Sequence, residues 1–271
     1  QAKPTTITKN GNVYTLGIGL EGTPSGSEVL TVSPVADAIF DGSGNVAITN
    51  QTINKKTLID KLAPTISNVV LSNDNSTAAV TFSEIVFKAS NGNGDLEPAD
   101  FVMTISGGRA KLKSATPTSV SKNGTTFTLG LDIQGTGTGK EVLAVIPKES
   151  SIYDNAGNVA LSTQTTNTGK TKDLTGPIIL SITPKSDNTA LIVEFDEEAF
   201  TDPNGSAILD TSDITLSLEG GNAVLTSPKP TSFSRTGASY TLGLALNGKV
   251  NGFEDITVQV QFNAIYDSLG N

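Results

Sequence analysis

The amino-acid sequence matches itself, without a gap, when it is shifted by 113 residues. Pro4-Thr5 recurs as Pro117-Thr118 and again as Pro230-Thr231. A longer motif recurs in the same register, as Tyr14-Thr15-Leu16-Gly17, Phe127-Thr128-Leu129-Gly130 and Tyr240-Thr241-Leu242-Gly243. A fixed period of this length indicates tandem copies of a whole domain rather than turns of a solenoid. Tandem copies are typical of spacing, reach or multivalent display, whereas a catalytic centre gains little from being repeated in series.

The given sequence begins in the middle of a repeat. We expect residues 1–62 to hold the second half of a repeat, residues 63–174 a complete repeat, and residues 175–271 a repeat that lacks its last strand. Half a repeat cannot bury its core, so the simplest interpretation is that this sequence is part of a longer polypeptide. The alternative is that a neighbouring chain supplies the missing strands by strand addition.

The composition excludes several kinds of chemistry. The chain contains no His, Cys or Trp, so nucleophile systems and metal sites built on imidazole or thiolate cannot form. A net charge of -9 disfavours nucleic acid and anionic membranes as partners, and it suits cations that bind oxygen ligands, such as calcium. No apolar run reaches the length of about 18 residues that direct membrane insertion requires. Abundant Gly, Thr, Ser and Asn with few aromatic residues favour an extracellular β-protein.

The complete copy has the pattern of an antiparallel β-sandwich, with short alternating strands and turn residues between them. Phe127, Leu129, Leu131 and Ile133 share one face of a strand and are expected to point into the core. One helical turn is expected near residues 95–100. The expected strands cover residues 65–71, 77–84, 101–106, 109–113, 125–133, 141–147 and 158–165.

Three motifs of this copy resemble the bacterial Ig-like repeats of S-layer proteins and large surface adhesins. They are Thr81-Phe82-Ser83-Glu84-Ile85-Val86, Asp100-Phe101, and Tyr153-Asp154-Asn155-Ala156-Gly157-Asn158. The third copy departs from the pattern with Phe195-Asp196-Glu197-Glu198. The resemblance implies tandem Ig-like sandwiches at the cell surface, with a spacer or display role that calcium often stiffens. It also implies contacts between neighbouring repeats and self-assembly into a filament or lattice, and it implies no enzymatic activity.

On an Ig-like frame, the linker before a repeat and two of its loops lie at the same end, so acidic residues of three segments are expected to meet there. Calcium takes 6–8 oxygen ligands from such loops. The alternative is that the Asp154 loop is only a hairpin turn with glycine in the left-handed region, and that Asp100 caps a turn. The expected ligands are Asp60, Glu84, Glu97, Asp100, Asp154 and Asn158 at one junction, and Asp173, Glu197, Asp210, Asp213, Asp267 and Asn271 at the next.

Paired carboxylates also occur in glycosidases, which place an acid and a base or nucleophile in a cleft. The chain has no Trp and only four Tyr to stack on sugar rings, and the acids recur in every copy. We therefore expect no enzyme, but a structural or adhesive segment of a long bacterial surface or secreted protein. The alternative function is an accessory or carbohydrate-binding module of a secreted polysaccharide-degrading enzyme, against which the same lack of aromatic platforms argues.

Overall fold

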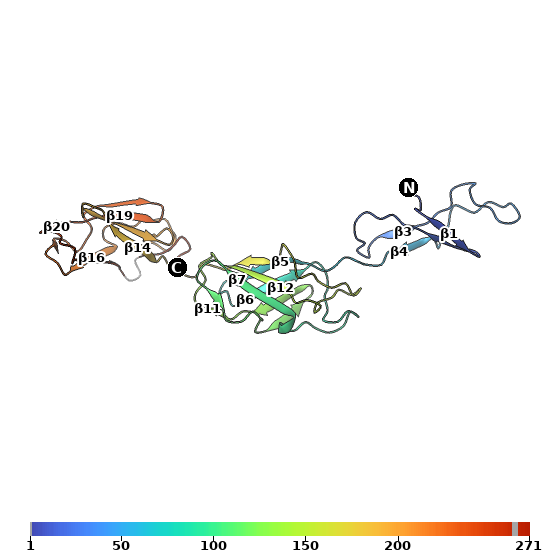
Figure 1. The fold of residues 1–271 in the computed structure, drawn as a ribbon, viewed down its shortest axis with the longest axis horizontal. Helices are drawn as coiled ribbons and strands as arrows, with labels where there is room; N and C mark the ends of the chain where they lie inside the picture. Colours follow the sequence, from blue (N-terminus) through green and yellow to red (C-terminus); the bar gives the residue numbers. More distant parts are fainter. Residues whose placement is uncertain (1, 262–264) are drawn as a thin grey trace.

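A computed structural model describes residues 2–261 and 265–271 of the chain. Within these ranges the chain forms antiparallel β-strands and a single short helix, the 3-10 helix η1 (Pro98–Asp100). The predicted all-β, sandwich-type fold is thereby confirmed. Figure 1 shows three bodies in a row, which we call the half-repeat (residues 1–62), the middle repeat (63–174) and the third repeat (175–271). In the part of the chain that is described, no helix is long and apolar enough to cross a membrane.

The middle repeat consists of two main sheets. One has the strand order β5-β6-β10-β9, the other has the order β13-β12-β7, and a small pair β11-β8 lies at one end. The strands are β5 (Ile66–Leu71), β6 (Thr77–Phe82), β7 (Phe101–Ser106), β8 (Lys111–Leu112), β9 (Val120–Asn123), β10 (Thr126–Gly130), β11 (Ile133–Gln134), β12 (Val142–Pro147) and β13 (Thr168–Lys170).

The core of the middle repeat follows from strict alternation along its strands. Every second residue of β6, β10 and β12 is buried, since side chains of a strand point alternately to its two faces. Three aromatic rings fill the centre: the Phe127 ring lies edge-on to Phe82, with 5.7 Å between centroids, and 6.3 Å from Phe101. Phe127 and Leu129 are fully buried as predicted, while Leu131 is only partly buried.

The third repeat repeats this plan. Each of its strands begins 113 residues after a strand of the middle repeat, and its sheets have the orders β14-β15-β19-β18, β16-β21 and β17-β20. A second core surrounds the buried Tyr240, whose ring is 5.3 Å from Phe195. The strands are β14 (Ile179–Pro184), β15 (Ala190–Phe195), β16 (Ile214–Glu219), β17 (Val224–Leu225), β18 (Phe233–Thr236), β19 (Ser239–Gly243), β20 (Leu246–Asn247) and β21 (Asp255–Val260).

The half-repeat contains only the later strands of the plan. These are β1 (Ile7–Asn10), β2 (Val13–Leu16), β3 (Val29–Thr31) and β4 (Lys55–Thr57), which occupy the positions of β9, β10, β12 and β13. They form two separate pairs, β1-β2 and β3-β4. Most of their apolar side chains are exposed, because nothing in the described chain takes the places of β6 and β7.

Two strand predictions were wrong. The expected strand at 158–165 makes only an isolated bridge between Tyr153 and Val159, and the sheet edge is formed by β13 instead. In place of a ladder, side chains at and just after the end of this stretch bind β5: Ile66 N–H donates to Gln164 Oε1, and the Thr166 hydroxyl donates to the Ile66 carbonyl. The expected strand at 125–133 splits into β10 and β11, which pair with different sheets, and β9 was not predicted.

Candidate functional site: the junctions between repeats

The structure brings six of the predicted ligands together in two acidic clusters, one at each junction. The first cluster consists of Asp60, Glu84 and Asp154, and the second of Asp173, Glu197 and Asp267. In each cluster one carboxylate oxygen from every residue lies within 4.8 Å of the others. Each cluster joins an aspartate of the linker to two acids of the repeat that follows it, so it spans the boundary between repeats.

The buried aspartate of each cluster is held by its own turn. Asp154 accepts hydrogen bonds from the N–H groups of Ala156 (2.8 Å) and Asn158 (2.7 Å), and from Nδ2 of Asn158 (2.7 Å). Asp267 accepts the same set from Leu269 and Asn271. Gly157 has a φ of 88°, a region that glycine enters without steric cost. The hairpin-turn interpretation is therefore correct for the loop itself, and the turn also fixes the carboxylate beside the linker.

The predicted asparagine ligands act as hydrogen-bond donors next to the clusters. Nδ2 of Asn158 binds Asp154, while Nδ2 of Asn271 binds Asp267 and also the main-chain carbonyl of Asp173 (3.2 Å). Asn271 of the third repeat thus contacts the linker that precedes this repeat. Figure 1 shows this return of the C-terminus to the junction with the middle repeat.

The glutamate of each cluster is electrostatically strained. Burial, followed by the charges of Asp154 and Asp60, raises the pKa of Glu84 above its ordinary value. Burial, followed by Asp173, Asp267 and Asp196, raises the pKa of Glu197 to about 7. Both effects disfavour the charged carboxylate, as desolvation and nearby like charges do. A cation placed between the three acids would attract each carboxylate, and this attraction would oppose the repulsion among them.

The donor set fits a hard cation. Every ligand atom in the clusters is a carboxylate oxygen, the type that calcium and magnesium prefer. Three carboxylates carry six oxygen atoms, and each oxygen has two lone pairs, so the turn bonds to Asp154 leave acceptor capacity. The clusters have no thiolate or imidazole, the donors that most zinc sites use.

Four predicted ligands lie outside the clusters and serve local turns. Glu97 and Asp100 form the capping box of η1: Glu97 N–H donates to Asp100 Oδ2 (2.7 Å), and the Glu97 side chain pairs with Lys88. Asp210 and Asp213 repeat this arrangement, with Asp210 N–H donating to Asp213 Oδ2 (2.7 Å). Their side chains satisfy adjacent backbone groups, so the prediction that they join the clusters was wrong and the capping interpretation of Asp100 was right.

Each linker is bonded in the same way to the repeat before it. Leu174 N–H donates to Gly137 O (2.9 Å), and its counterpart Lys61 N–H donates to Pro24 O (2.9 Å). Thr171 N–H donates to Glu141 O (3.1 Å), and Leu58 N–H donates to Glu28 O (2.8 Å). The linkers are therefore docked strands and turns rather than free tethers.

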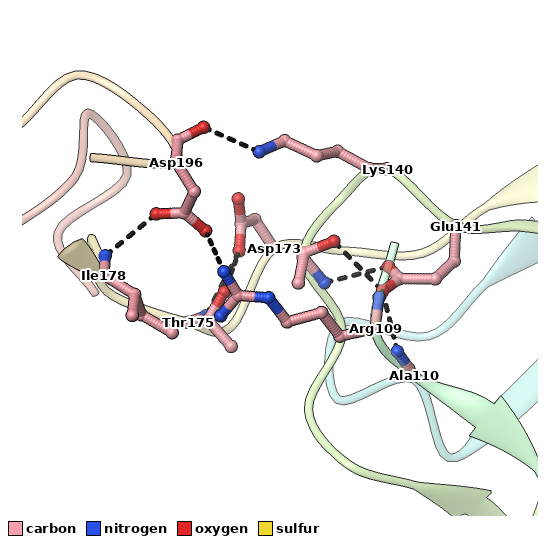
Figure 2. Close-up of polar contacts among 9 residues, drawn as sticks. Arg109, Ala110, Lys140, Glu141, Asp173, Thr175, Ile178 and Asp196 are labelled. Atoms are coloured by element: carbon pink, nitrogen blue, oxygen red, sulfur yellow. Dashed lines mark hydrogen bonds and ion pairs between the residues drawn. The ribbon is translucent and has the colours of Figure 1, made fainter. Parts of the chain in front are cut away.

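Glu141 lies under the second linker, and the sequence analysis did not identify it as a structural residue. Its buried carboxylate accepts hydrogen bonds from the N–H groups of Arg109 (2.7 Å) and Ala110 (3.0 Å), which Figure 2 shows, and also from Thr138 N–H (2.9 Å) and the Thr171 hydroxyl (2.7 Å). Burial alone would raise the pKa of Glu141, but these hydrogen bonds lower it to about 2. Glu28 and Glu254 occupy the same position of the repeat, so recurrence at the 113-residue period was the signal that could have found it.

Among the described residues, the second junction carries a contact that has no counterpart at the first one. Arg109 of the middle repeat forms an ion pair with Asp196 of the third repeat (3.0 Å), and Lys140 Nζ donates to the Asp196 carbonyl (2.9 Å). Figure 2 shows both side chains reaching across to Asp196, which also accepts from Ile178 N–H (2.8 Å). The middle repeat has Ser83 in place of Asp196, and this serine keeps only the local bond, from Thr65 N–H (3.0 Å).

Comparisons with known proteins add two distant neighbours. No protein-family model matches the chain, and no curated protein matches it. One similar solved structure is the N-terminal part of the bacterial S-layer protein SbsC (21% identity, 73% of this chain, 44% of that chain, TM-score 0.31). Another is the S-layer protein rSbsC(31-844) (20% identity, 76% of this chain, 26% of that chain, TM-score 0.29). The chain spans less than half the length of each, and likeness at this level assigns no function.

Proposed function

We propose that this chain is a structural segment of a bacterial cell-surface or secreted protein, in which tandem Ig-like repeats act as a spacer or as elements of a filament or lattice. The observation that supports this proposal is the construction of the junctions. Both linkers are hydrogen-bonded to the repeat before them, and the second junction is bridged by Arg109, Lys140 and Asp196. Repeats joined in this way hold their outer ends at a set distance, which is what a spacer requires.

The partners in this proposal are neighbouring repeats and other copies of the same protein. A net charge of -9 keeps such a chain soluble and away from nucleic acid and anionic lipid. The proposal includes no catalytic activity.

We further propose that calcium binds at each acidic cluster and stiffens the junction. The linker acid Asp60 or Asp173 and the two acids of the following repeat would then share one ion, which couples linker and repeat. The raised pKa values of Glu84 and Glu197 mark the repulsion that the ion would remove. Binding to the folded state alone stabilises it by about 2.7 kcal/mol when calcium is at about 100 times its dissociation constant.

Small-angle scattering and thermal melting of the full chain, with calcium and with a chelator, test both parts. The spacer proposal expects one extended particle of defined length, and a broad distribution of shapes in both conditions would overturn it.

The calcium proposal expects a higher melting temperature with the ion, a gain that the double variant Glu84→Gln, Glu197→Gln should abolish. Glu149→Gln, an exposed acid of the middle repeat, is the matched control and should keep the gain. Equal melting with and without calcium would overturn the metal site alone.

A further inference from the structure

In the middle repeat, the first strand and the last segment lie side by side. The last segment covers residues 164–174, contains β13 and continues into the second linker; we call it the strap. At the start of β5, Ile66 N–H donates to Gln164 Oε1, and the Thr166 hydroxyl donates to the Ile66 carbonyl. These two bonds join the start of β5 to the start of the strap.

Asn75, in the turn after β5, joins the other end of this strand to the strap. Lys172 N–H donates to Asn75 Oδ1 (2.7 Å), and Asn75 Nδ2 donates to the Lys172 carbonyl (2.8 Å). The asparagine is 4% exposed and has a φ of 56°, in the left-handed region that asparagine enters more readily than most residues. Its amide offers one donor and one acceptor, as a residue of a neighbouring strand would.

Between these two ends, β5 and β13 pack closely although they belong to different sheets. A Cβ on Gly169 would lie 2.6 Å from the Val69 carbonyl oxygen and 2.9 Å from Leu71 Cδ1, so the absence of a side chain lets the two strands approach. Contacts further along β5 are made by residues further along the strap, so both segments run in the same direction.

The strap is also fixed to the second sheet. β13 pairs with β12, and Asn167 Nδ2 donates to the Val145 carbonyl (2.8 Å), while Val145 N–H donates to the Asn167 carbonyl (2.9 Å). On its other edge, β5 pairs with β6 of the first sheet. The bonds between β5 and the strap therefore connect the two sheets of the repeat.

The common direction of β5 and the strap decides how tension acts on the repeat. The first linker enters at the start of β5, the second linker leaves from the end of the strap, and Figure 1 shows the neighbouring bodies at opposite ends of the middle repeat. Tension along the chain therefore pulls β5 and the strap in opposite directions along their own axes. The bonds at both ends of β5 then carry the load together, whereas bonds that are peeled apart from one end carry it one at a time.

We propose that the middle repeat bears tension along the chain, and that the bonds of the strap to Ile66 and Asn75 form the clamp that resists extension. This function goes beyond that of a spacer, because holding a distance requires no resistance to force. Each bond of the clamp involves a side chain, so a single substitution removes part of the clamp and leaves the backbone pairing of the sheets in place.

The test pulls on the full chain through pairs of introduced cysteines, which are unique because the chain has no Cys. The pair Lys61→Cys, Leu174→Cys uses exposed residues of the two linkers and loads the clamp lengthwise. The pair Lys61→Cys, Asn123→Cys loads the first sheet crosswise, because the strand register places Asn123 at the same end of this sheet as the start of β5. The unfolding rate of the middle repeat is measured at the same constant force in both geometries.

Three variants are compared in each geometry. Thr166→Val removes one hydroxyl from the clamp, and Asn75→Gly removes the Asn75 side chain without straining its positive φ. Thr126→Val is the matched control, since it removes a hydroxyl that pairs with Thr81 (3.0 Å) between β6 and β10, outside the clamp. Urea denaturation of each variant establishes that it folds.

We expect the unsubstituted repeat to unfold more slowly under lengthwise than under crosswise load. Under lengthwise load, Thr166→Val and Asn75→Gly should each unfold about 10-fold faster, because forced unfolding follows the unfolding barrier and each variant loses hydrogen bonds that this barrier must break. Under crosswise load both should stay within about threefold of the unsubstituted rate, and Thr126→Val should do so in both geometries.

Three outcomes would overturn the proposal. The first is an equal unfolding rate of the unsubstituted repeat in both geometries. The second is an unchanged lengthwise rate in both Thr166→Val and Asn75→Gly, which would mean that these bonds carry no load. The third is an equal acceleration of these variants in both geometries, because a bond that only stabilises the fold acts whatever the direction of pulling. None of these results bears on the particle length that tests the spacer.

Discussion

At the scale of single residues, Glu141 holds three separate stretches of backbone in place. Its carboxylate accepts hydrogen bonds from N–H groups of the turn after β7 and of residue 138. It also accepts one from the Thr171 hydroxyl at the start of the second linker. Glu254 does the same in the third repeat, where it accepts from the N–H groups of Asn222, Ala223 and Asn251. A carboxylate suits this position because it only accepts hydrogen bonds and has room for several.

Replacing this carboxylate by an amide should destabilise the middle repeat. In Glu141→Gln the amide group faces N–H donors and loses charge-assisted hydrogen bonds, so we expect a loss of about 2–3 kcal/mol of unfolding free energy. Urea denaturation at pH 7 measures this loss. Glu149→Gln, on the exposed surface of the same repeat, should change stability by less than about 0.5 kcal/mol. An equally small effect for Glu141→Gln would contradict the structural role.

Glu141 also makes the stability of the middle repeat depend on pH. The folded-state pKa of Glu141, about 2, lies below its ordinary value of 4.5. Its contribution is therefore fully present above pH 4.5 and is lost as the pH falls towards 2. Wild-type protein should lose stability relative to Glu141→Gln across this interval, so the difference between their urea midpoints should shrink as the solution is acidified.

At the scale of elements, the turn between β7 and β8 is fitted to Glu141. Gly107 and Gly108 both have positive φ, of 78° and 45°. A Cβ on Gly108 would overlap with Glu141 Oε1, so a side chain there collides with the group that the turn binds. Gly221 has the same relation to Glu254 in the third repeat. Gly108 is therefore required by the carboxylate as well as by the turn, whereas a Cβ on Gly107 would meet the backbone carbonyl of Lys140.

Gly108→Ala should cost clearly more than a change at another left-handed glycine. Gly124, in the hairpin between β9 and β10, has a φ of 62°, and a Cβ at this position would have no other atom within 4 Å. We expect Gly124→Ala to cost about 1 kcal/mol from backbone strain and Gly108→Ala to cost at least about 2 kcal/mol more. Thermal melting of the two variants measures the difference, and equal losses would mean that Glu141 moves aside without cost.

At the scale of the whole molecule, the two junctions differ in how they are restrained. The linkers and acidic clusters are equivalent, but only the second junction has the Arg109 and Asp196 ion pair among the described residues. The Arg109 side chain is 44% exposed, so solvent screens its end of the pair and the pair adds little to stability, whereas the Asp196 side chain is only 8% exposed. Its consequence is orientation, because, together with the bond from Lys140 Nζ to the Asp196 carbonyl, it connects the two repeats directly.

Asp196→Ser isolates this contact. Serine is the residue that the middle repeat uses at this position, and it can still accept from Ile178 N–H as Ser83 accepts from Thr65. We expect unchanged melting within about 1 kcal/mol but a wider range of angles between the middle and third repeats, measured by residual dipolar couplings. Asp132→Ser removes an ion pair with Lys113 inside the middle repeat and should leave the angles unchanged. Unaltered couplings in Asp196→Ser would show that the ion pair does not set the angle.

Local patterns predicted much of this architecture, since their causes lie within a few residues. Alternation placed Phe127 and Leu129 in a core, and the motif from Asp154 to Asn158 indicated a hairpin turn with glycine in the left-handed region, which the structure shows. The 113-residue period extended each of these inferences to every copy. The approach of Asp60 and Asp173 to acids of the following repeat was expected for another reason, because the Ig-like frame places the linker beside the turn.

Long-range contacts could be decided only by the tertiary structure. Glu97 and Asp210 satisfy their own turns, while Glu84 and Glu197 meet the linker, and no local pattern separates these glutamates and aspartates. The partners of Glu141 and Asp196 lie 32 and 87 residues away in the chain. Such contacts depend on where strand ends converge after the sheets have packed. The surroundings of an acid at these points decide its role. An acid that meets N–H donors becomes a structural acceptor, an acid that meets other carboxylates is repelled, and an acid that meets a cation of a neighbouring repeat bridges the two repeats.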